Sequence, residues 1–177
     1  MTDRRDAVES LCSEEVCLNE WPIESIIVKL QVGPIDDAKM DLVVTSRKLA
    51  PSLSQSSGKV GGFALPPVGV QERTTAKSVV YWPEITLMTP NRRPLIYNAT
   101  KKALTAAEEK GARGVGIFTL GLEVTGVPSW EIAEEIVRAV GHHSKEKRSV
   151  DRVELVVGSP IQVSSFQYVL NNHTLFT

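Results

Sequence analysis

The chain has 177 residues, of which 42% are hydrophobic and 23% charged, and its formal net charge is −1 at pH 7. This length is enough to bury the core of one domain without disulfides or metal ions. The near-zero net charge excludes a basic field over the whole surface that would recruit DNA or RNA. No apolar run is long enough to cross a bilayer, and the first residues lack the apolar core of a signal peptide. Cys12 and Cys17 form neither a metal quartet nor a disulfide framework, so the sequence predicts a cytoplasmic protein without a cofactor.

The first 22 residues are acid-rich and are expected to form an N-terminal extension, either a short amphipathic helix or a loose segment, before a domain over 23–177. A run rich in β-branched residues predicts the first strand at Ile23–Leu30. After a glycine-proline break and a polar turn, Met40–Val44 predicts the second strand. The serine- and glycine-rich segment 45–62 predicts a long loop, and a loop of this length in a compact domain is often functional.

The middle of the chain predicts two further strands and a helix. The strands are Phe63–Leu65 and Ser78–Trp82, and Glu84–Met88 is expected to extend the second of them. The helix covers Asn91–Lys110 and ends near Gly111. Its predicted apolar face consists of Leu95, Ala99, Ala103 and Ala106.

The most informative pattern follows this helix and consists of a buried strand, a glycine-punctuated loop and a capped helix. Val115–Leu120 is the predicted strand and Gly121–Val127 the predicted loop. Ser129 fits the N-cap of the helix, which is expected to end before Gly141. The apolar stripe of this helix lies at helical spacing and consists of Ile132, Ala133, Ile136, Val137 and Val140.

Val153–Val157 and Phe166–Leu170 predict the last two strands. The alternation of strands and helices predicts an α/β fold, a three-layer α/β/α domain with a mixed and largely parallel sheet. A glycine loop between the end of a strand and the start of a helix is a place where phosphates bind, because backbone N–H groups point outward and the helix dipole favours an anion. The alternative for Gly121–Val127 is an ordinary strand-to-helix turn that binds nothing.

The order of these elements, above all over Leu95–Val157, resembles the macro domain, whose typical members bind ADP-ribose and related nucleotides. In this resemblance Leu95–Lys110 corresponds to the family's long helix and Gly114–Leu120 to its phosphate-loop strand. Gly121–Pro128 corresponds to the loop that cradles the distal phosphate and ribose, and Ile26–Val44 supplies the first two strands. The resemblance implies a macro-like fold with a ligand cleft at the C-terminal ends of the strands.

Two loops depart from the family's motifs. The family's V-N-A-A-N adenosine loop is replaced by Val44–Lys48, which lacks the asparagine that serves in some hydrolases. The S-T-G-I-[FY]-G-x-P loop is replaced by Gly121–Pro128, which keeps only the distal glycine and the proline and has Glu123 in place of the first glycine. A carboxylate there adds repulsion and bulk beside a pyrophosphate. The aspartate of the family's G-D-I motif is compared with the one in Val32–Asp36.

Two functions follow from the resemblance. The first is a binding module for ADP-ribose or a related nucleotide or phosphate ligand. Its expected ligand-binding residues are Thr45, Ser46, Arg47, Tyr81, Gly121, Leu122, Glu123, Val124, Thr125 and Gly126. The second is a macro-like domain that has lost its ligand and acts as a structural or protein-interaction module, with self-association as one form. The glycine-to-helix pattern favours the first function and the departures favour the second. No hydrolase residue is recognisable, so no catalytic residue is predicted.

Three residue pairs have alternative interpretations. Tyr81 and Trp82 end a strand at the ligand edge, where they either stack on a base or ribose or pack in the core. Arg92–Arg93 either contacts a phosphate or, by default, lies in solvent. His142–His143 is expected in a solvated turn after a helix rather than in a metal site. No motif for zinc, calcium or a nucleoside triphosphate is present, and no membrane or nucleic-acid partner is predicted.

Overall fold

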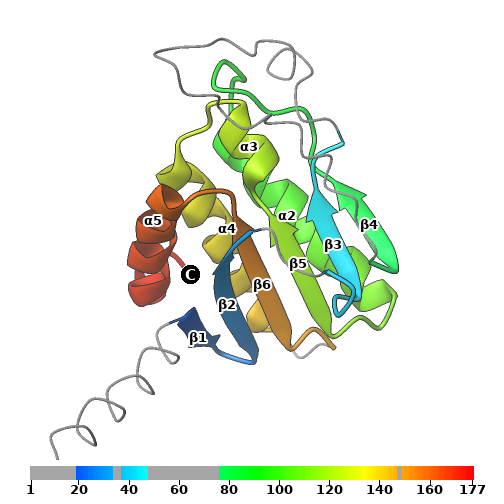
Figure 1. Ribbon diagram of the computed structural model, residues 1–177. Coiled ribbons are helices and arrows are strands. Elements are labelled where there is room, and N and C mark those ends of the chain that lie inside the picture. Colours follow the sequence, from blue (N-terminus) through cyan, green and yellow to red (C-terminus); the bar gives the residue numbers. More distant parts are fainter. Residues whose placement is uncertain (1–18, 34–36, 48–75, 147–148) are drawn as a thin grey trace, which may run out of the picture.

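The computed structural model drawn in Figure 1 describes four stretches of the chain, namely residues 19–33, 37–47, 76–146 and 149–177. Most of the expected N-terminal extension lies outside the described residues, as does most of the long segment 45–62. The expected strand Phe63–Leu65 and the aspartate compared with the G-D-I motif also lie outside them.

The centre of the domain is a six-stranded sheet in the order β1-β2-β6-β5-β3-β4. The neighbouring strands are parallel except for β1, which runs antiparallel to β2. The strands are β1 (Glu20–Ile23), β2 (Ile26–Val32), β3 (Leu42–Thr45), β4 (Ser78–Tyr81), β5 (Gly114–Phe118) and β6 (Arg152–Val157). β3 and β5 are buried along their whole length, as expected for central strands of a parallel sheet. The predicted α/β fold with a mixed sheet is confirmed.

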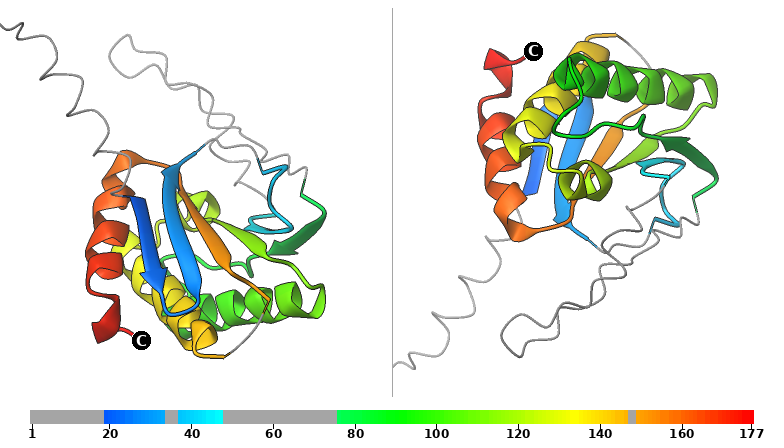
Figure 2. Two further views of the ribbon diagram at one scale, coloured as in Figure 1. Left: turned by 90° about the horizontal axis from the view of Figure 1, so that it is seen from below. Right: turned by 90° about the horizontal axis from the view of Figure 1, so that it is seen from above.

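Three long helices pack on one face of this sheet (Figure 1, Figure 2). They are α2 (Arg92–Glu109), α4 (Ser129–Ser144) and α5 (Pro160–Asn171). Two short elements are α3 (Leu120–Val124), directly after β5, and the 3-10 helix η3 (His173–Leu175). The main hydrophobic core lies between the sheet and the long helices, and its largest side chains include Leu42, Ile117, Leu155, Ile96, Leu104, Ile132, Ile136 and Phe166.

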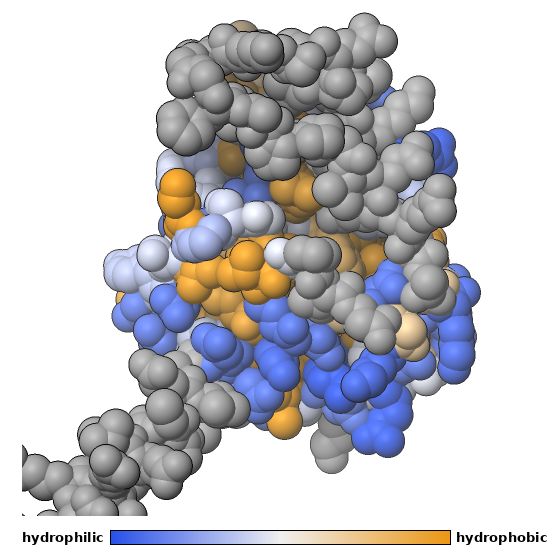
Figure 3. All heavy atoms as spheres, viewed as in Figure 1, coloured by the Kyte–Doolittle hydropathy of each residue, from blue (hydrophilic) through white to orange (hydrophobic). Residues whose placement is uncertain are grey.

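The opposite face of the sheet carries a second and smaller core. Its buried members are Met40, Val43, Phe118 and Val156. Figure 3 views the molecule from this side and shows hydrophobic side chains gathered in the middle, with hydrophilic side chains below them. In the part of the chain that the structure describes, every long helix lies on the side of the larger core, so these residues build two of the three expected layers.

The predicted strand Ile23–Leu30 is two strands joined by a tight turn. Glu24 lies in the turn between β1 and β2 and has a positive φ of 51°. Two-residue turns between antiparallel strands need such left-handed backbone, usually at glycine or asparagine. The single-strand prediction is wrong because β-branched residues flank a turn that has no such marker. β1 begins at Glu20, so it crosses the boundary expected between extension and domain.

α2 confirms the predicted helix, and Gly111, with a φ of 63°, follows its end as expected. The buried face differs from the prediction, because Leu95 is exposed while Ile96 and Leu104 are fully buried. The predicted face consists mainly of alanines, whose small side chains mark the apolar face of a helix only weakly. The two larger side chains decide which face packs on the sheet. Thr100 lies on the same buried face, and its hydroxyl donates a hydrogen bond to the Ile96 carbonyl at 2.9 Å.

α4 contains the predicted apolar stripe, which is buried, but both ends of the helix differ from the prediction. Pro128 is the cap residue, and the hydroxyl of Ser129 lies 3.0 Å from that of Ser165 instead of capping the helix. The helix continues through Gly141, which is buried. A Cβ at this position would collide with Thr177, so this glycine serves close packing rather than helix termination.

Two predicted strands are wrong. Phe166–Leu170 lies within α5, and Glu84–Met88 contains no strand. The aromatic and β-branched composition of the first segment is typical of a strand, but its buried residues Phe166, Val169 and Leu170 follow helical spacing. Pro160 in the first turn was the available signal, because its fixed φ suits the start of a helix.

Candidate ligand site at the carboxyl edge of the sheet

The C-terminal ends of β3, β4, β5 and β6 lie side by side, because these strands are parallel neighbours. We call this border the carboxyl edge, which is where ligands of open α/β sheets bind. Thr45 is the last residue of β3 and is followed by Ser46 and Arg47, while Tyr81 is the last residue of β4. α3 follows the end of β5, and Gly126 lies two residues beyond α3. The expected ligand-binding residues therefore meet at one edge of the sheet.

Arg47 and Tyr81 form an exposed pair at this edge. The guanidinium carbon of Arg47 lies 5.0 Å from the centroid of the Tyr81 ring, and Tyr81 is 44% exposed. This is the geometry of a cation–π contact. Thr45 is buried, and its carbonyl accepts a hydrogen bond from the backbone amide of Trp82 at 2.9 Å. The pair thus presents a cation and an aromatic ring to solvent at the hydrogen-bonded end of β3.

Trp82 has a different role from Tyr81. Its side chain is buried, and the indole Nε1 donates a hydrogen bond to the carbonyl of Phe118 at 2.8 Å. Phe118 is the last residue of β5, so this bond ties the end of β4 to a strand that is not its neighbour. Of the two expected alternatives, core packing therefore applies to Trp82, whereas Tyr81 faces outward, where it could stack on a ligand.

The segment expected as an open glycine loop is mostly the helix α3. The carbonyl of Thr119 accepts hydrogen bonds from the amides of Leu122, at 3.0 Å, and Glu123, at 3.1 Å. The amides of Gly126 and Val127 donate to the carbonyls of Glu123 and Leu122 at 2.9 and 3.2 Å. The open-loop prediction is wrong because these amides are already paired within the segment.

The other side chains of this segment contribute to packing. Leu122 is buried in the main core, and Val124 is partly buried. The hydroxyl of Thr125 donates a hydrogen bond to the carbonyl of Ile85 at 2.7 Å, which joins α3 to the segment before α2. Gly126 has a φ of 82°, a conformation that glycine adopts without strain.

Gly121 and Ser46 bring the first turn of α3 against the end of β3. A Cβ on Gly121 would overlap both the hydroxyl oxygen and the Cβ of Ser46. This approach is possible only with glycine at position 121, since the Ser46 Cβ is fixed to the backbone and cannot move away alone. Gly121 therefore serves the contact between the two segments that the sequence assigned to the ligand.

The side chain of Glu123 bridges the ends of β5 and β6. Its Oε1 accepts a hydrogen bond from the Thr119 hydroxyl at 2.6 Å and another from the Gly158 amide at 3.2 Å. A Cβ on Gly158 would lie 2.5 Å from Glu123 Oε2, so the carboxylate uses space that a side chain would fill. This bridge fixes a negative charge at the carboxyl edge. Its partner Gly158 is distant in sequence, and no local motif indicates it.

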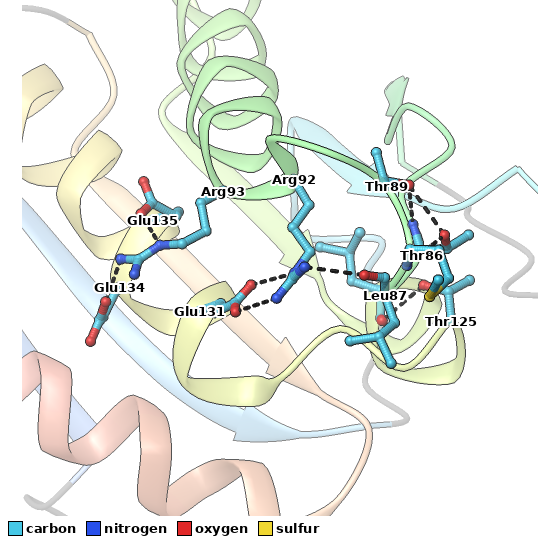
Figure 4. A network of polar contacts seen from close by, with 11 residues as sticks. Thr86, Leu87, Thr89, Arg92, Arg93, Thr125, Glu131, Glu134 and Glu135 are labelled. Carbon is cyan, nitrogen blue, oxygen red and sulfur yellow. Dashed lines mark hydrogen bonds and ion pairs between the residues drawn. The ribbon is translucent and has the colours of Figure 1, made fainter.

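Arg92 and Arg93, beside the edge, bind the acidic first turns of α4 (Figure 4). Arg92 makes a bidentate pair with Glu131 through two N···O contacts of 2.6 Å, and it also donates to the carbonyl of Leu87 at 3.1 Å. The hydrogen bond to Glu131 raises the pKa of Arg92. Arg93 binds two further carboxylates, those of Glu134 and Glu135. The default expectation that Arg92 and Arg93 lie in solvent is wrong. The apolar stripe of α4 packs in the core, and the acidic residues in the first turns of this helix then lie beside the start of α2, where they bind both arginines.

The two adjacent histidines lie inside α4 rather than in a turn beyond it. His143 is buried, and its Nε2 lies 2.9 Å from the carboxylate of Glu108. The Nδ1 of His142 lies 2.8 Å from the Tyr97 hydroxyl. Burial lowers the pKa of His142, and nearby cations lower it further, namely Lys145, Arg138 and Lys101. The expectation of a solvated turn is therefore wrong for His143.

Among the described residues, no group of three or more histidine, cysteine or acidic side chains is arranged to hold a metal ion. In the described parts of the chain, no helix combines the length and the apolar character that crossing a membrane requires.

No protein-family model matches this chain, and no curated protein matches it. Solved structures do match. The macrodomain of Oceanobacillus iheyensis with ADP has a TM-score of 0.63 at 15% identity, over 88% of this chain and 96% of that chain. The Trypanosoma brucei macrodomain in complex with ADP has a TM-score of 0.55 at 15% identity, over 80% and 68%. The macro domain of ganglioside induced differentiation associated protein 2 gives 0.57 at 15% identity, over 84% of both chains. The chain has the macrodomain fold.

Proposed function

We propose that this protein is a binding module for ADP-ribose or a related nucleotide-like ligand, which it holds at the carboxyl edge. The observation that carries the proposal is the exposed pair of Arg47 and Tyr81 at the ends of β3 and β4. A guanidinium matches a phosphate group through paired N–H donors, and a tyrosine ring offers a face on which a base or ribose stacks. The two groups together fit a ligand that has an anionic and a planar part.

The fold supports the proposal at a coarser level. Similar structures were solved with ADP in the macrodomains of O. iheyensis and T. brucei, and with ADPR in a variant of the first. Sequence identities of 15–17% to these structures carry the fold but not the ligand residues. The residues assigned to binding in this chain therefore rest on their own chemistry and placement.

A second function is a macro-like module that has lost its ligand and acts through protein contacts. The observation that favours it is α3, in which the amides of Leu122 and Glu123 are paired with Thr119 instead of facing a ligand. α5 would offer a surface for a second copy of the chain, because Ile161 is 83% exposed and Tyr168, two turns later, is 64% exposed. Self-association is then the expected form of this second function.

The test is isothermal titration calorimetry of the full chain with ADP-ribose and with AMP. We expect saturable binding by the wild type, weakened at least several-fold by Arg47→Ala and by Tyr81→Ala, because each removes one of the two recognition groups. Arg113→Ala is the matched control. Arg113 is 76% exposed in its side chain and lies before β5, at the opposite edge of the sheet, so its loss should leave binding unchanged.

The same samples separate the two functions. An absence of heat, together with no thermal-shift stabilisation at millimolar ligand, contradicts the binding proposal. Under the second function, sedimentation equilibrium should show a dimer that Tyr168→Ala dissociates. Binding that Arg113→Ala weakens as much as Arg47→Ala would place the ligand elsewhere on the molecule.

A further inference from the structure

The carboxyl edge has charges of opposite sign at its two ends. Arg47 follows β3 and contacts Tyr81 of β4. Glu123 lies beyond β5, where it joins the ends of β5 and β6 through Thr119 and Gly158. In the strand order β6-β5-β3-β4, the acidic group therefore lies over the first pair of strands and the basic group over the second.

The carboxylate of Glu123 accepts hydrogen bonds from two donors at its end of the edge, so these donors are already engaged when an anionic ligand approaches. The Thr119 hydroxyl lies on a fully buried residue and donates to Glu123 at 2.6 Å, while the Gly158 amide donates at 3.2 Å. Hydrogen bonds to an ionised acceptor are stronger than neutral ones. A phosphate that approached this place would have to displace the carboxylate or lie beside a like charge, and both cost free energy.

We infer that Glu123 is a specificity-determining residue, which admits one phosphate group near Arg47 and disfavours a second one near β5 and β6. This inference rests on the proposed function, and it ranks the nucleotide-like ligands: those with a single phosphate group bind more tightly than those with a pyrophosphate. The base lies over Tyr81 and the first phosphate beside Arg47, so a second phosphate would extend toward Glu123. Glu123 acts here through its charge and not only through its hydrogen bonds.

The test compares adenosine, AMP, ADP and inorganic pyrophosphate as ligands of the wild type and of Glu123→Gln, measured by calorimetry. Glutamine keeps an oxygen that accepts the bonds from Thr119 and Gly158, but it removes the charge. We expect the wild type to bind AMP more tightly than ADP, and Glu123→Gln to shift the ratio of the two affinities about tenfold toward ADP. The affinity for adenosine should not change, because adenosine carries no phosphate.

Glu109→Gln is the matched control, since it removes the same charge from an exposed position at the end of α2, beside the opposite edge. It should leave the ratio of the AMP and ADP affinities as in the wild type. If Glu123→Gln does not fold, the wild type alone still tests the inference. A higher salt concentration screens the charge of the Glu123 carboxylate, so it should reduce the preference of the wild-type protein for AMP over ADP.

The outcomes separate this inference from the proposed function. Wild-type binding with the same AMP-to-ADP ratio in Glu123→Gln overturns the inference and leaves the proposed function standing. ADP or pyrophosphate binding that appears only in Glu123→Gln, while the wild type binds AMP, supports both the inference and the proposed function. An absence of binding by both proteins overturns both.

Discussion

The Nε2 of His143 donates a hydrogen bond to the carboxylate of Glu108 at 2.9 Å, because an ionised carboxylate can only accept. The same carboxylate accepts bonds from the amide and hydroxyl of Ser149, at 2.7 and 2.6 Å, and from the amide of Val150 at 3.2 Å. Glu108 lies near the end of α2, His143 lies in α4, and Ser149 precedes β6. The side chain of Glu108 thus joins three segments at the edge of the sheet opposite the carboxyl edge.

This relationship predicts a pH-dependent stability. Burial alone would raise the pKa of Glu108, but the bonds from Ser149, His143 and Val150 outweigh it and lower the pKa to about 2 from 4.5. A lowered pKa stabilises the fold above the unfolded value of 4.5, and this stabilisation is lost as the pH falls from there to about 2. Glu108→Gln should lower the free energy of unfolding by about 1–3 kcal/mol at pH 7.

Urea denaturation at several pH values measures this effect. The free energies of unfolding of wild type and Glu108→Gln should converge below pH 4.5. The neighbouring exposed Glu109→Gln is the control and should match the wild type within about 0.5 kcal/mol. A difference between wild type and Glu108→Gln that is as large at pH 3 as at pH 7 would contradict the role of the charge.

We expect the truncation of two arginines, Arg92 and Arg113, to have very different effects on the stability of the protein. Arg92→Ala leaves the buried carboxylate of Glu131 without its bidentate partner, and an uncompensated buried charge is strongly destabilising. Arg113→Ala removes an exposed pair with Asp151, which should contribute little. Differential scanning calorimetry should show a melting temperature lowered by several degrees for Arg92→Ala and almost unchanged for Arg113→Ala. Equal melting temperatures of the two variants would contradict a stabilising role of the pair between Arg92 and Glu131.

Gly121→Ala should destabilise the protein, because the new methyl group overlaps the side chain of Ser46. Overpacking of this kind costs about 1–3 kcal/mol, which chemical denaturation detects. Gly114→Ala is the matched control in the same part of the chain. Its Cβ would meet only the guanidinium group of Arg152, at 3.3 Å, and this long side chain is half-exposed and can move. Tolerance of both substitutions would mean that Ser46 and Gly121 are not in close contact.

Hydrolysis of ADP-ribosylated protein is not expected. Thr45, Ser46 and Arg47 offer no general base, because hydroxyl and guanidinium groups are poor proton acceptors. Glu123 is held by Thr119 and Gly158 and is the one carboxylate among the expected ligand residues. An assay of released ADP-ribose should therefore stay at background. Turnover that Glu123→Gln abolishes would contradict this prediction and make Glu123 catalytic.

The elements that sequence patterns predict correctly are those with a continuous apolar run or a complete apolar stripe. The central strands β3, β5 and β6 are β-branched apolar runs, and α4 has a complete apolar stripe. α5 differs from the predicted strand because its aromatic and β-branched residues have strand propensity, which tertiary packing overrides. The hairpin at Glu24 was missed because a charged residue supplies the left-handed turn.

The sequence predicts only part of the candidate site. Parallel order implies that strand ends meet, so the proximity of Arg47, Tyr81 and Gly121 followed from the predicted topology. The topology does not predict that the expected glycine loop forms the helix α3. A helix of five residues depends on tertiary hydrogen bonds, such as the one from Thr125 to Ile85. The bridge from Glu123 to Gly158 joins two segments with no shared pattern, and only the structure reveals it.

The most direct test of ligand binding at the carboxyl edge is a titration of the isotope-labelled protein followed by backbone amide NMR shifts. With AMP or ADP-ribose at millimolar concentration, we expect saturable shifts at Ser46, Arg47 and Tyr81 and across Gly121–Gly126. Amides at the opposite edge, such as that of Arg113, should not move. Shifts confined to that opposite edge, or no saturable shift at all, would contradict a nucleotide site at the ends of β3, β4 and β5.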